Sequence, residues 1–343
     1  MNITFLIGNG FDINLGLKTR YADFYDYYQE HASEDSMILQ MMQEDNNKEN
    51  WADLELALGE KLKGIGEDSV ESFMDAHAEL DSLLLDYLEE EQKKYTVEEL
   101  EDEIIPELVR SLKELPKELS TEEQRSYQAT CDTHKNEETQ YSFITFNYTD
   151  ILDEIIKKAK SANLDLGTHT STNGQNRKHK LGEVHHVHGS LMEGVVLGVN
   201  DESQINNDIL KQNSLFKNVF LKGNINSQMG QRRTERAEEM IDGSMIICIF
   251  GMSMGITDKR WWERLVSWML ANPNRKLIIY SRADEKYFKR MIPTQVIRVR
   301  EKVRRDFWKK GRGNQADSAY SDISARLFVI FNSKIFGFPK CSN

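Results

Sequence analysis

The chain has 343 residues, of which 39% are hydrophobic and 29% are charged, so it carries enough apolar side chains for the core of one large domain or of two ordinary ones. No window of roughly 18 apolar residues exists, so no transmembrane helix is predicted, and the N-terminus lacks the pattern of a signal peptide. The three cysteines are odd in number and match no zinc spacing. These features predict a protein of the reducing cytoplasm with no bound metal and no membrane contact.

Charge is distributed unevenly along the chain. Residues 1–140 carry 35 acidic against 12 basic side chains, whereas residues 141–343 carry 21 acidic against 32 basic ones. The simplest interpretation is an acidic helical module beside a basic one, in contact within one subunit or between subunits of a homo-oligomer. The alternative is that the basic half attracts ligands that carry phosphate.

The chain opens with an apolar, β-favouring run over residues 3–7, which predicts a buried strand. The turn that follows reads Gly8-Asn9-Gly10-Phe11-Asp12. A strand that ends in such a turn lets backbone N–H groups reach a phosphate, and a helix is predicted next, over residues 15–28. Ile13 stands where the last glycine of the pattern G-x-G-x-x-G belongs, so an ordinary tight turn stays an alternative.

Residues 25–140 are expected to form an acidic, all-helical insertion. Apolar residues recur at three- and four-residue spacing over 51–62 and 69–91, and no strand pattern is present. A further helix over 97–115 is expected to kink or break at Pro106, which lacks a backbone N–H group.

Strands and helices alternate from residue 141 onward. Strands are predicted at 141–148, near 195–199, and at 245–251, 276–280 and 295–299, with a polar loop at 168–180 and a second helical insertion at about 201–243. This alternation predicts an α/β fold with a Rossmann-like, parallel sheet and helices on both faces. The expected nucleotide-binding core therefore comprises residues 1–24 and 141–343.

Three more polar motifs follow predicted strands, at the edge where open α/β sheets bind ligands. They are Thr145-Phe146-Asn147-Tyr148-Thr149-Asp150, His188-Gly189-Ser190 and Gly251-Met252-Ser253-Met254-Gly255-Ile256-Thr257-Asp258. Asp150 and Asp258 have the alternative role of capping the next helix, and Asn147 that of forming a turn. His188 has His185 and His186 beside it, but strand alternation separates His185 from the other two, which disfavours a metal site.

These motifs form part of a larger set of residues. The set comprises Gly8-Asn9-Gly10-Phe11-Asp12, Thr19, Tyr21, Phe24, Trp51, Asp53, Glu55, Asn147-Tyr148-Thr149, His188-Gly189 and Gly251-x-Ser253. In them the chain resembles, over nearly its whole length, the AbiH family of bacterial abortive-infection proteins. The resemblance implies a toxic effector of phage defence that a phage component triggers, and the helical insertions are natural candidates for gating it.

More distantly, the order of the motifs resembles that of sirtuins and SIR2-like enzymes, which consume NAD. Thr149 stands where those enzymes carry an aspartate, Asn9 stands between the two glycines in place of a small residue, and the four-cysteine zinc module of deacetylating sirtuins is absent, which argues against deacetylation. The resemblance implies an NAD site in which Asn147 and His188 are catalytic. The residues implied to bind NAD are Gly8, Asn9, Gly10, Phe11, Asp12, Thr145, Tyr148, Gly189, Gly251, Ser253 and Asp258.

Hydrolysis of the nicotinamide–ribose bond passes through an oxocarbenium-like centre, because nicotinamide leaves neutral from a cationic precursor. Asn147 can orient water or ribose hydroxyls, and a histidine near its ordinary pKa, here His188, can act as a base. The pyrophosphate is expected over the first glycine turn, anchored by convergent N–H groups. Trp51 and Glu55 are expected to face one pocket, with Asp53 pointing elsewhere or capping.

Two other functions stay open. Residues 259–312 carry 17 basic against 5 acidic side chains, which favours a defence protein that binds or cleaves nucleic acid, although no clustered carboxylates for two metals are evident. A non-catalytic sensor that binds NAD or a related nucleotide would use the same residues as the enzyme.

Overall fold

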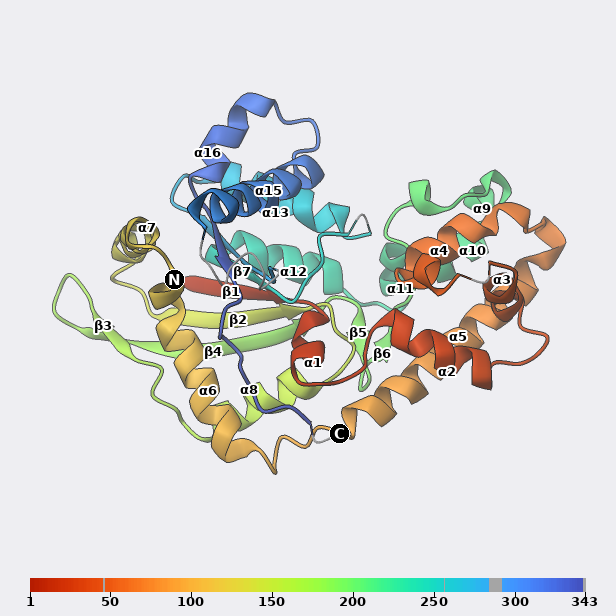
Figure 1. Cartoon of the computed structure of the whole chain (residues 1–343), viewed down its shortest axis with the longest axis horizontal. Coiled ribbons are helices and arrows are strands. Elements are labelled where there is room, and N and C mark those ends of the chain that lie inside the picture. The colour runs from red at the N-terminus through yellow and green to blue at the C-terminus, as the bar shows by residue number, and fades with distance from the viewer. Residues whose placement is uncertain (46, 256, 284–291, 342–343) are drawn as a thin grey trace.

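The computed structural model describes residues 1–343 except 46, 256, 284–291 and 342–343. A seven-stranded sheet lies between two layers of helices, and a helical lobe adjoins one end of the sheet (Figure 1). The sheet consists of β1 (Asn2–Ile7), β2 (Thr139–Thr145), β3 (Thr168–Thr170), β4 (Asn176–His186), β7 (Ser244–Phe250), β8 (Lys276–Ser281) and β9 (Leu327–Phe331). Two short strands, β5 (Gly189–Ser190) and β6 (Gly194–Val195), pair separately.

The strand order is β3-β4-β2-β1-β7-β8-β9, and every neighbouring pair is parallel except the β3–β4 hairpin. The central strands are buried along nearly their whole length, because helices cover both faces, and this explains their continuous apolar sequences. From β1 the chain steps outward to β2 and β4, then returns to β7 on the other side of β1. This reversal is that of a Rossmann-type sheet, whose ligand crevice lies where the order reverses, here between β1 and β7. The predicted fold class is confirmed.

Many helices belong to two long connections between strands, a first crossover from β1 to β2 (residues 8–138) and a second crossover from β4 to β7 (residues 187–243), and the others follow β2, β7 and β8. They are α1 (Gly10–Asn14), α2 (Tyr21–His31), α3 (Met37–Asp45), α4 (Leu54–Lys61), α5 (Val70–Gln92), α6 (Glu101–Glu114), α7 (Thr121–Thr133), α8 (Ile151–Ser161), α9 (Asp208–Gln212), α10 (Ser214–Phe220), α11 (Lys222–Gln228), α12 (Arg233–Asp242), α13 (Lys259–Ala271), α15 (Pro293–Gly311) and α16 (Tyr320–Ser324). Among the described residues, no helix is both long enough and apolar enough to cross a membrane.

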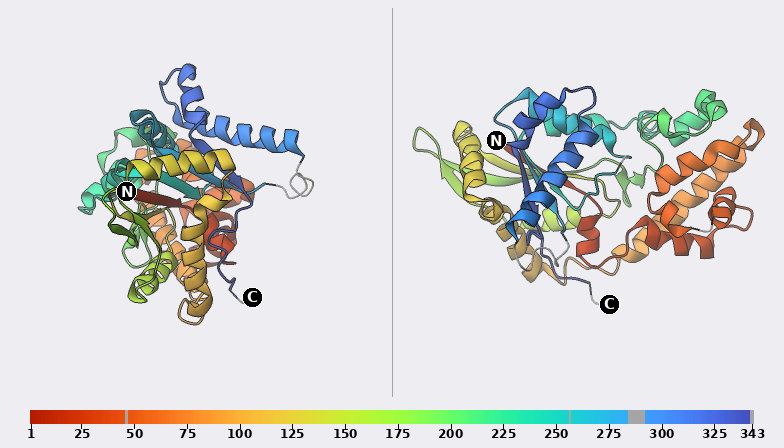
Figure 2. Two further views of the ribbon diagram at one scale, coloured as in Figure 1. Left: turned by 90° about the vertical axis from the view of Figure 1, so that its left-hand side faces the viewer. Right: turned by 45° about the horizontal axis from the view of Figure 1, so that its top comes forward.

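Each face of the sheet has its own hydrophobic core. One core joins the sheet to α1, α6, α7, α8 and the C-terminal segment, and the other joins it to α12, α13, α15 and α16. Trp261, Trp262 and Trp268 of α13 lie in the second core. Figure 2 shows α15 projecting beyond the sheet at its N-terminal end.

The helical lobe has a third core, built by two segments far apart in sequence. Helices α2 to α5 supply most of it, and Phe216 and Phe220 of α10 pack into it against Phe73 of α5. The acidic segment 25–140 therefore divides, because α6 and α7 pack on the sheet and not in the lobe. Both crossovers contribute to one lobe beside the ligand edge of the sheet.

Four local predictions were wrong. No single helix covers residues 15–28, because Gly16, with φ +96°, separates α1 from α2. Residues 168–180 form the β3–β4 hairpin and not a loop. Residues 295–299 lie in α15, where Pro293 occupies the first turn. Helix α6 continues through Pro106 without the predicted break, and its apolar face packs on the sheet.

Candidate functional site

The strand register brings the predicted motifs to one edge of the sheet. Ile7 at the end of β1 pairs with Thr145 of β2 on one side and with Phe250 of β7 on the other. Thr145 in turn pairs with His186, the last residue of β4. The turns that follow these four strands therefore leave the sheet at the same level, at the crevice between β1 and β7.

A cavity of about 1020 Å³ opens at this edge. Its walls come from the turns after β1, β2, β4 and β7, from the lobe and from the C-terminal segment. The predicted residues that line it are Gly8, Asn9, Gly10, Asp12, Asn147, Tyr148, His188, Gly251, Ser253 and Asp258. Ile256, within the last motif, lies outside the described residues.

Three predicted residues stand behind the cavity wall. Phe11 is buried in the core, where it packs against Phe336 and Phe338, so its side chain does not line the cavity. The Thr145 hydroxyl accepts the Asn147 N–H at 3.1 Å and holds the turn. Gly189 has φ +78°, and a Cβ there would lie 1.9 Å from the Gly194 carbonyl oxygen. A glycine is therefore required here by the backbone conformation and by the close approach of Gly194.

The first glycine turn is packed against the turn after β7. A Cβ on Gly10 would lie 2.5 Å from Gly251 Cα, and one on Gly8 would lie 2.8 Å from the Gly251 carbonyl oxygen. The Gly8 N–H donates to the Phe250 carbonyl at 2.9 Å and the Gly10 N–H to the Gly251 carbonyl at 2.7 Å. These two N–H groups are therefore occupied, which corrects their expected role as anchors of a pyrophosphate.

A buried carboxylate fixes the side chain of Asn147. Asp12 Oδ1 accepts from Asn147 Nδ2 at 3.0 Å, and Asp12 Oδ2 accepts from Thr149 Oγ1 at 2.9 Å. Burial raises the pKa of Asp12 to about 6, against the opposing effect of these two hydrogen bonds. Thr149, the residue that departs from the sirtuin-like pattern, thus has a defined task as a donor to Asp12.

The other end of the Asn147 amide is unpaired. Because a carboxylate only accepts hydrogen bonds, the nitrogen of the amide faces Asp12 and the oxygen faces away. Asn147 Oδ1 is buried and has no hydrogen-bond partner among the described residues. Buried polar atoms in folded proteins are nearly always paired, so this acceptor is a natural contact for a ligand in the cavity.

His188 lies beside a buried ion pair that joins the two crossovers. Lys222 at the start of α11 donates to Glu55 Oε2 of α4 at 2.7 Å, and its Nζ lies 3.5 Å from His188 Nε2. The hydroxyls of Tyr21 and Tyr148 donate to Glu55 Oε1 at 3.2 and 3.4 Å. Glu55 therefore lines the cavity, as considered from the sequence, whereas Trp51 precedes α4 and is buried in the lobe.

Burial and the Lys222 charge shift the pKa values of His188 and Glu55. Burial lowers the pKa of His188 well below its usual value, and the positive charges of Lys222 and Arg233 lower it further. Burial raises the pKa of Glu55, although Lys222 opposes the shift. His188 is thus a neutral hydrogen-bonding group near pH 7, not the histidine of ordinary pKa that the sequence suggested.

Asp53 and Asp258 both line the cavity, one before α4 and the other before α13. Asp53 Oδ1 accepts from the Leu56 N–H at 3.2 Å and so caps α4, and its Oδ2 accepts from Thr257 Oγ1 at 3.1 Å. Asp258 immediately precedes α13 but makes no side-chain cap hydrogen bond. Burial raises the pKa of Asp258 to about 7.

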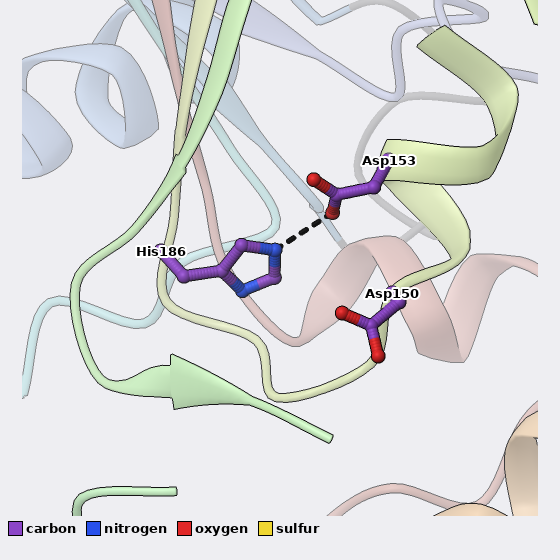
Figure 3. Close-up of side chains that lie close together, drawn as sticks. All are labelled: Asp150, Asp153 and His186. Atoms are coloured by element: carbon purple, nitrogen blue, oxygen red, sulfur yellow. Dashed lines mark hydrogen bonds and ion pairs between the residues drawn. The ribbon is translucent and has the colours of Figure 1, made fainter. Parts of the chain in front are cut away.

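A second acidic cluster, outside the cavity lining, consists of Asp150, Asp153 and His186 (Figure 3). His186 Nε2 pairs with Asp153 Oδ2 at 2.7 Å, and His186 Nδ1 bonds the Asn147 carbonyl oxygen at 3.0 Å. Burial lowers the pKa of His186, but the Asp153 hydrogen bond and charge outweigh it and raise the pKa above its usual value. Both ring nitrogens are thus occupied, and the group holds the backbone of Asn147 in place.

Sequence reasoning missed two parts of the site. Lys222 is one lysine among many in the second crossover, and no pattern distinguished it. Ser333, Ile335 and Gly337 of the C-terminal segment line the cavity because Phe336 is anchored in the core below. The family motifs did include Tyr21 and Glu55, which is the signal that pointed toward the lobe.

Comparison with known proteins places this geometry in a family. The model of the family described as "Bacteriophage abortive infection AbiH" matches residues 4–280, a range that includes every motif of the cavity up to Asp258. A search of curated proteins found no match. The match covers most of the chain and agrees with the residues that carried the resemblance, and the chain therefore belongs to the AbiH family of bacteriophage abortive-infection proteins.

Proposed function

We propose that this protein, which has the phage abortive-infection role of its family, acts as the effector by binding and hydrolysing NAD⁺. The observation that carries the proposal is the unpaired Asn147 Oδ1, buried at the switch point of a Rossmann-type sheet. The cavity beside it, about 1020 Å³, is of the size that enzymes use for cofactors, for which roughly 300–1000 Å³ is usual.

The two ends of the cavity suit different parts of a dinucleotide. The cavity lining that includes Asn147 and His188 also includes the carboxyl groups of Asp53 and Asp258, which favour the cationic nicotinamide riboside, whereas Glu55 is neutralised by Lys222. At the other end, Arg282 lines the wall with the polar side chains of Asn14 and Asn332. Because the Gly8 and Gly10 N–H groups are occupied, we assign the phosphates to the Arg282 end.

Hydrolysis then follows from orientation and charge. Asn147 Oδ1 accepts a ribose hydroxyl, and neutral His188 accepts a second hydrogen bond from the ribose or from water without adding positive charge next to the developing oxocarbenium centre. The C1′–N bond breaks with its electron pair on nicotinamide, which leaves neutral. Water then bonds to C1′, so ADP-ribose, nicotinamide and one proton are released.

The test is release of nicotinamide and ADP-ribose from NAD⁺ by the purified full chain. Asn147→Ala is expected to lower turnover by at least about 10²-fold, the usual loss when an oriented transition-state contact is removed. Asn224→Ala is the matched control, because Asn224 bonds Asn218 in the second crossover and does not line the cavity. Equal turnover in Asn147→Ala and the wild type would refute the proposal. NAD⁺ binding without release would favour the sensor.

Helix α15 supports a second candidate, nucleic-acid binding. Its exposed face carries Arg298, Lys302, Arg305 and Lys309, and α15 projects from the body of the protein (Figure 2). Residues 284–291 of the predicted basic stretch lie outside the described residues. Binding of RNA or DNA that weakens steeply with salt, and that the exchange of Arg298 and Lys302 to Ala reduces, would support this function.

A further inference from the structure

The strongest unused group in the cavity is the Asp258 carboxyl. Three other acids line the cavity within the described part of the chain, and each is occupied: Asp12 by Asn147 and Thr149, Asp53 by Leu56 N–H and Thr257, and Glu55 by Lys222. Asp258, at the end of the Gly251 turn, accepts no hydrogen bond from any described residue, and it leaves even the helix it precedes uncapped. Its oxygens are therefore available to a ligand.

The backbone holds Asp258 in a defined position on the cavity wall. Its carbonyl oxygen accepts from the Trp261 N–H at 2.9 Å at the start of α13, and the preceding residue, Thr257, is tied by its carbonyl to Asn200 Nδ2 at 2.6 Å. Trp261 is buried in the core. A carboxyl group that is fixed through its backbone and unpaired at its side chain is suited to act on a bound molecule.

The charged groups that face Asp258 are Lys222, Glu55 and Asp53. Lys222 is neutralised by Glu55, with which it forms a buried pair. His188 is a poor proton acceptor, because burial, and after it the charges of Lys222 and Arg233, lower its pKa well below its usual value. Among the described residues, the cavity lining thus contains one neutral histidine, three occupied acids and one available carboxyl group.

We propose that Asp258 is the general base of the site: its carboxylate faces the cationic nicotinamide riboside and takes the proton of the water that attacks C1′. This inference rests on the proposed hydrolysis of NAD⁺. As nicotinamide leaves with the electron pair of the C1′–N bond, the water oxygen bonds to C1′ and one water proton passes to a carboxylate oxygen of Asp258. The carboxylic acid then releases this proton to solvent, so the site returns to its first state.

The environment of Asp258 suits this task near neutral pH. Burial raises its pKa to about 7, partly offset by the Lys222 charge, and a general base works best when its pKa lies close to the working pH. Because the base must be ionised, kcat is expected to rise with pH up to about 7 and then to level off.

The experiment compares wild type, Asp258→Asn, Asp258→Glu and Asp201→Asn in the full chain. Asp201 lies near the same end of α13, as the influence of Lys259 on it shows, but it caps its own turn and does not line the cavity. Nicotinamide release is measured from pH 5.5 to 8.5, and ADP-ribose binding is measured by calorimetry. We expect Asp258→Asn to lower kcat by about 10²–10⁴-fold and to lose the acid limb of the profile.

The companion variants and the binding measurement make the result decisive. Asp258→Glu should recover part of the activity and keep an acid limb, whereas Asp201→Asn should behave as the wild type. ADP-ribose, which lacks the cationic ring, should bind Asp258→Asn within about threefold of the wild type, which shows an intact fold. Nicotinamide release with an unchanged kcat and acid limb in Asp258→Asn would refute the role of Asp258 alone. No release by any form, including the wild type, would refute the proposed function together with this step.

Discussion

Asn147 Nδ2 lies 3.0 Å from Asp12 Oδ1, and this single contact determines which end of the Asn147 amide is left for a ligand. The two residues are far apart in sequence and meet because β1 and β2 pair in parallel and end at the same level. Asp12 therefore acts on the reaction through Asn147, as a positioning residue.

Rescue by a conservative variant tests this positioning. Asp12→Ala removes the acceptor and leaves the buried Asn147 and Thr149 donors unpaired, so we expect kcat for nicotinamide release to fall by about tenfold or more, equivalent to roughly 1–3 kcal/mol. Asp12→Asn keeps an acceptor oxygen toward Asn147 and should recover most of the activity. Equal kcat values in the two variants would contradict the positioning role.

Asp12 also predicts how stability depends on pH. Its pKa is raised from 3.8 to about 6 on folding, so the folded state holds this proton more tightly than the unfolded state, and the burial of ionised Asp12 destabilises the fold at pH values above 6. The penalty declines as the pH falls from 6 toward 3.8 and is absent below that. Against Asp12→Asn, the free energy of unfolding of the wild type should improve by up to about 3 kcal/mol over this window. Urea titrations at pH 4.5 and 7.5 measure it, and parallel stability curves for the two proteins would contradict it.

The close packing of Gly10 predicts that a side chain at this position destabilises the fold. A Cβ there would lie 2.5 Å from Gly251 Cα, which is backbone and cannot rotate away. We expect Gly10→Ala to lower the free energy of unfolding by about 1–3 kcal/mol or more, as overpacking does. Gly64 is the control, because a Cβ there meets nothing within 4 Å. Thermal unfolding of both alanine variants gives the comparison, and similar melting temperatures would argue against tight contact between the two turns.

The Glu55–Lys222 pair predicts a non-additive result. Both side chains are buried and lie 2.7 Å apart, so Lys222→Met alone leaves an unpaired buried carboxylate and should cost about 3–5 kcal/mol. Glu55→Gln in the same chain removes that charge and should recover a large part of the loss. A double-mutant cycle of the free energies of unfolding measures the coupling. Additive effects would show that the two charges do not stabilise each other.

The burial of Phe336 indicates that the C-terminal segment after β9 is part of the core. Its ring is fully buried and packs against Phe5, Phe11 and Phe250, so Phe336→Ala should cost about 3–5 kcal/mol. Lys340→Ala, in the same segment but exposed, should leave the free energy of unfolding within about 0.5 kcal/mol. Chemical denaturation distinguishes the two, and a small loss for Phe336→Ala would mean that the segment is dispensable.

The sequence predicted the centre of the sheet well and its margins poorly. Central strands such as β7 are buried on both faces and read as continuous apolar runs. The β3–β4 hairpin lies at the sheet edge, alternates between exposed and partly buried residues, and was read as a loop. Residues 295–299 contain β-branched residues, but they belong to the first turns of α15, a long helix whose later residues Phe307 and Trp308 pack in the same core as α13. Leu327–Phe331 was not among the predicted strands, although it has the same apolar pattern as β7.

The sequence predicted those site residues that directly follow the ends of strands. Asn147, His188 and Asp258 follow strands whose register the fold sets, and they reach the cavity as expected. The occupied N–H groups of Gly8 and Gly10 were not predictable, since the motif does not reveal which backbone packs beside it. The Lys222 charge that lowers the pKa of His188 comes from the second crossover, and no spacing rule connects the two.

The division of the lobe core between α2–α5 and α10 has a consequence for a cell that makes this protein. During translation, chains fold progressively from the N-terminus, yet the apolar face of the first crossover stays uncovered until Phe216 and Phe220 have left the ribosome. Lys222 follows them in the sequence and pairs with Glu55, and Gly337, a further residue of the cavity lining, comes later still. A nascent or truncated chain that lacks these residues therefore has no finished cavity.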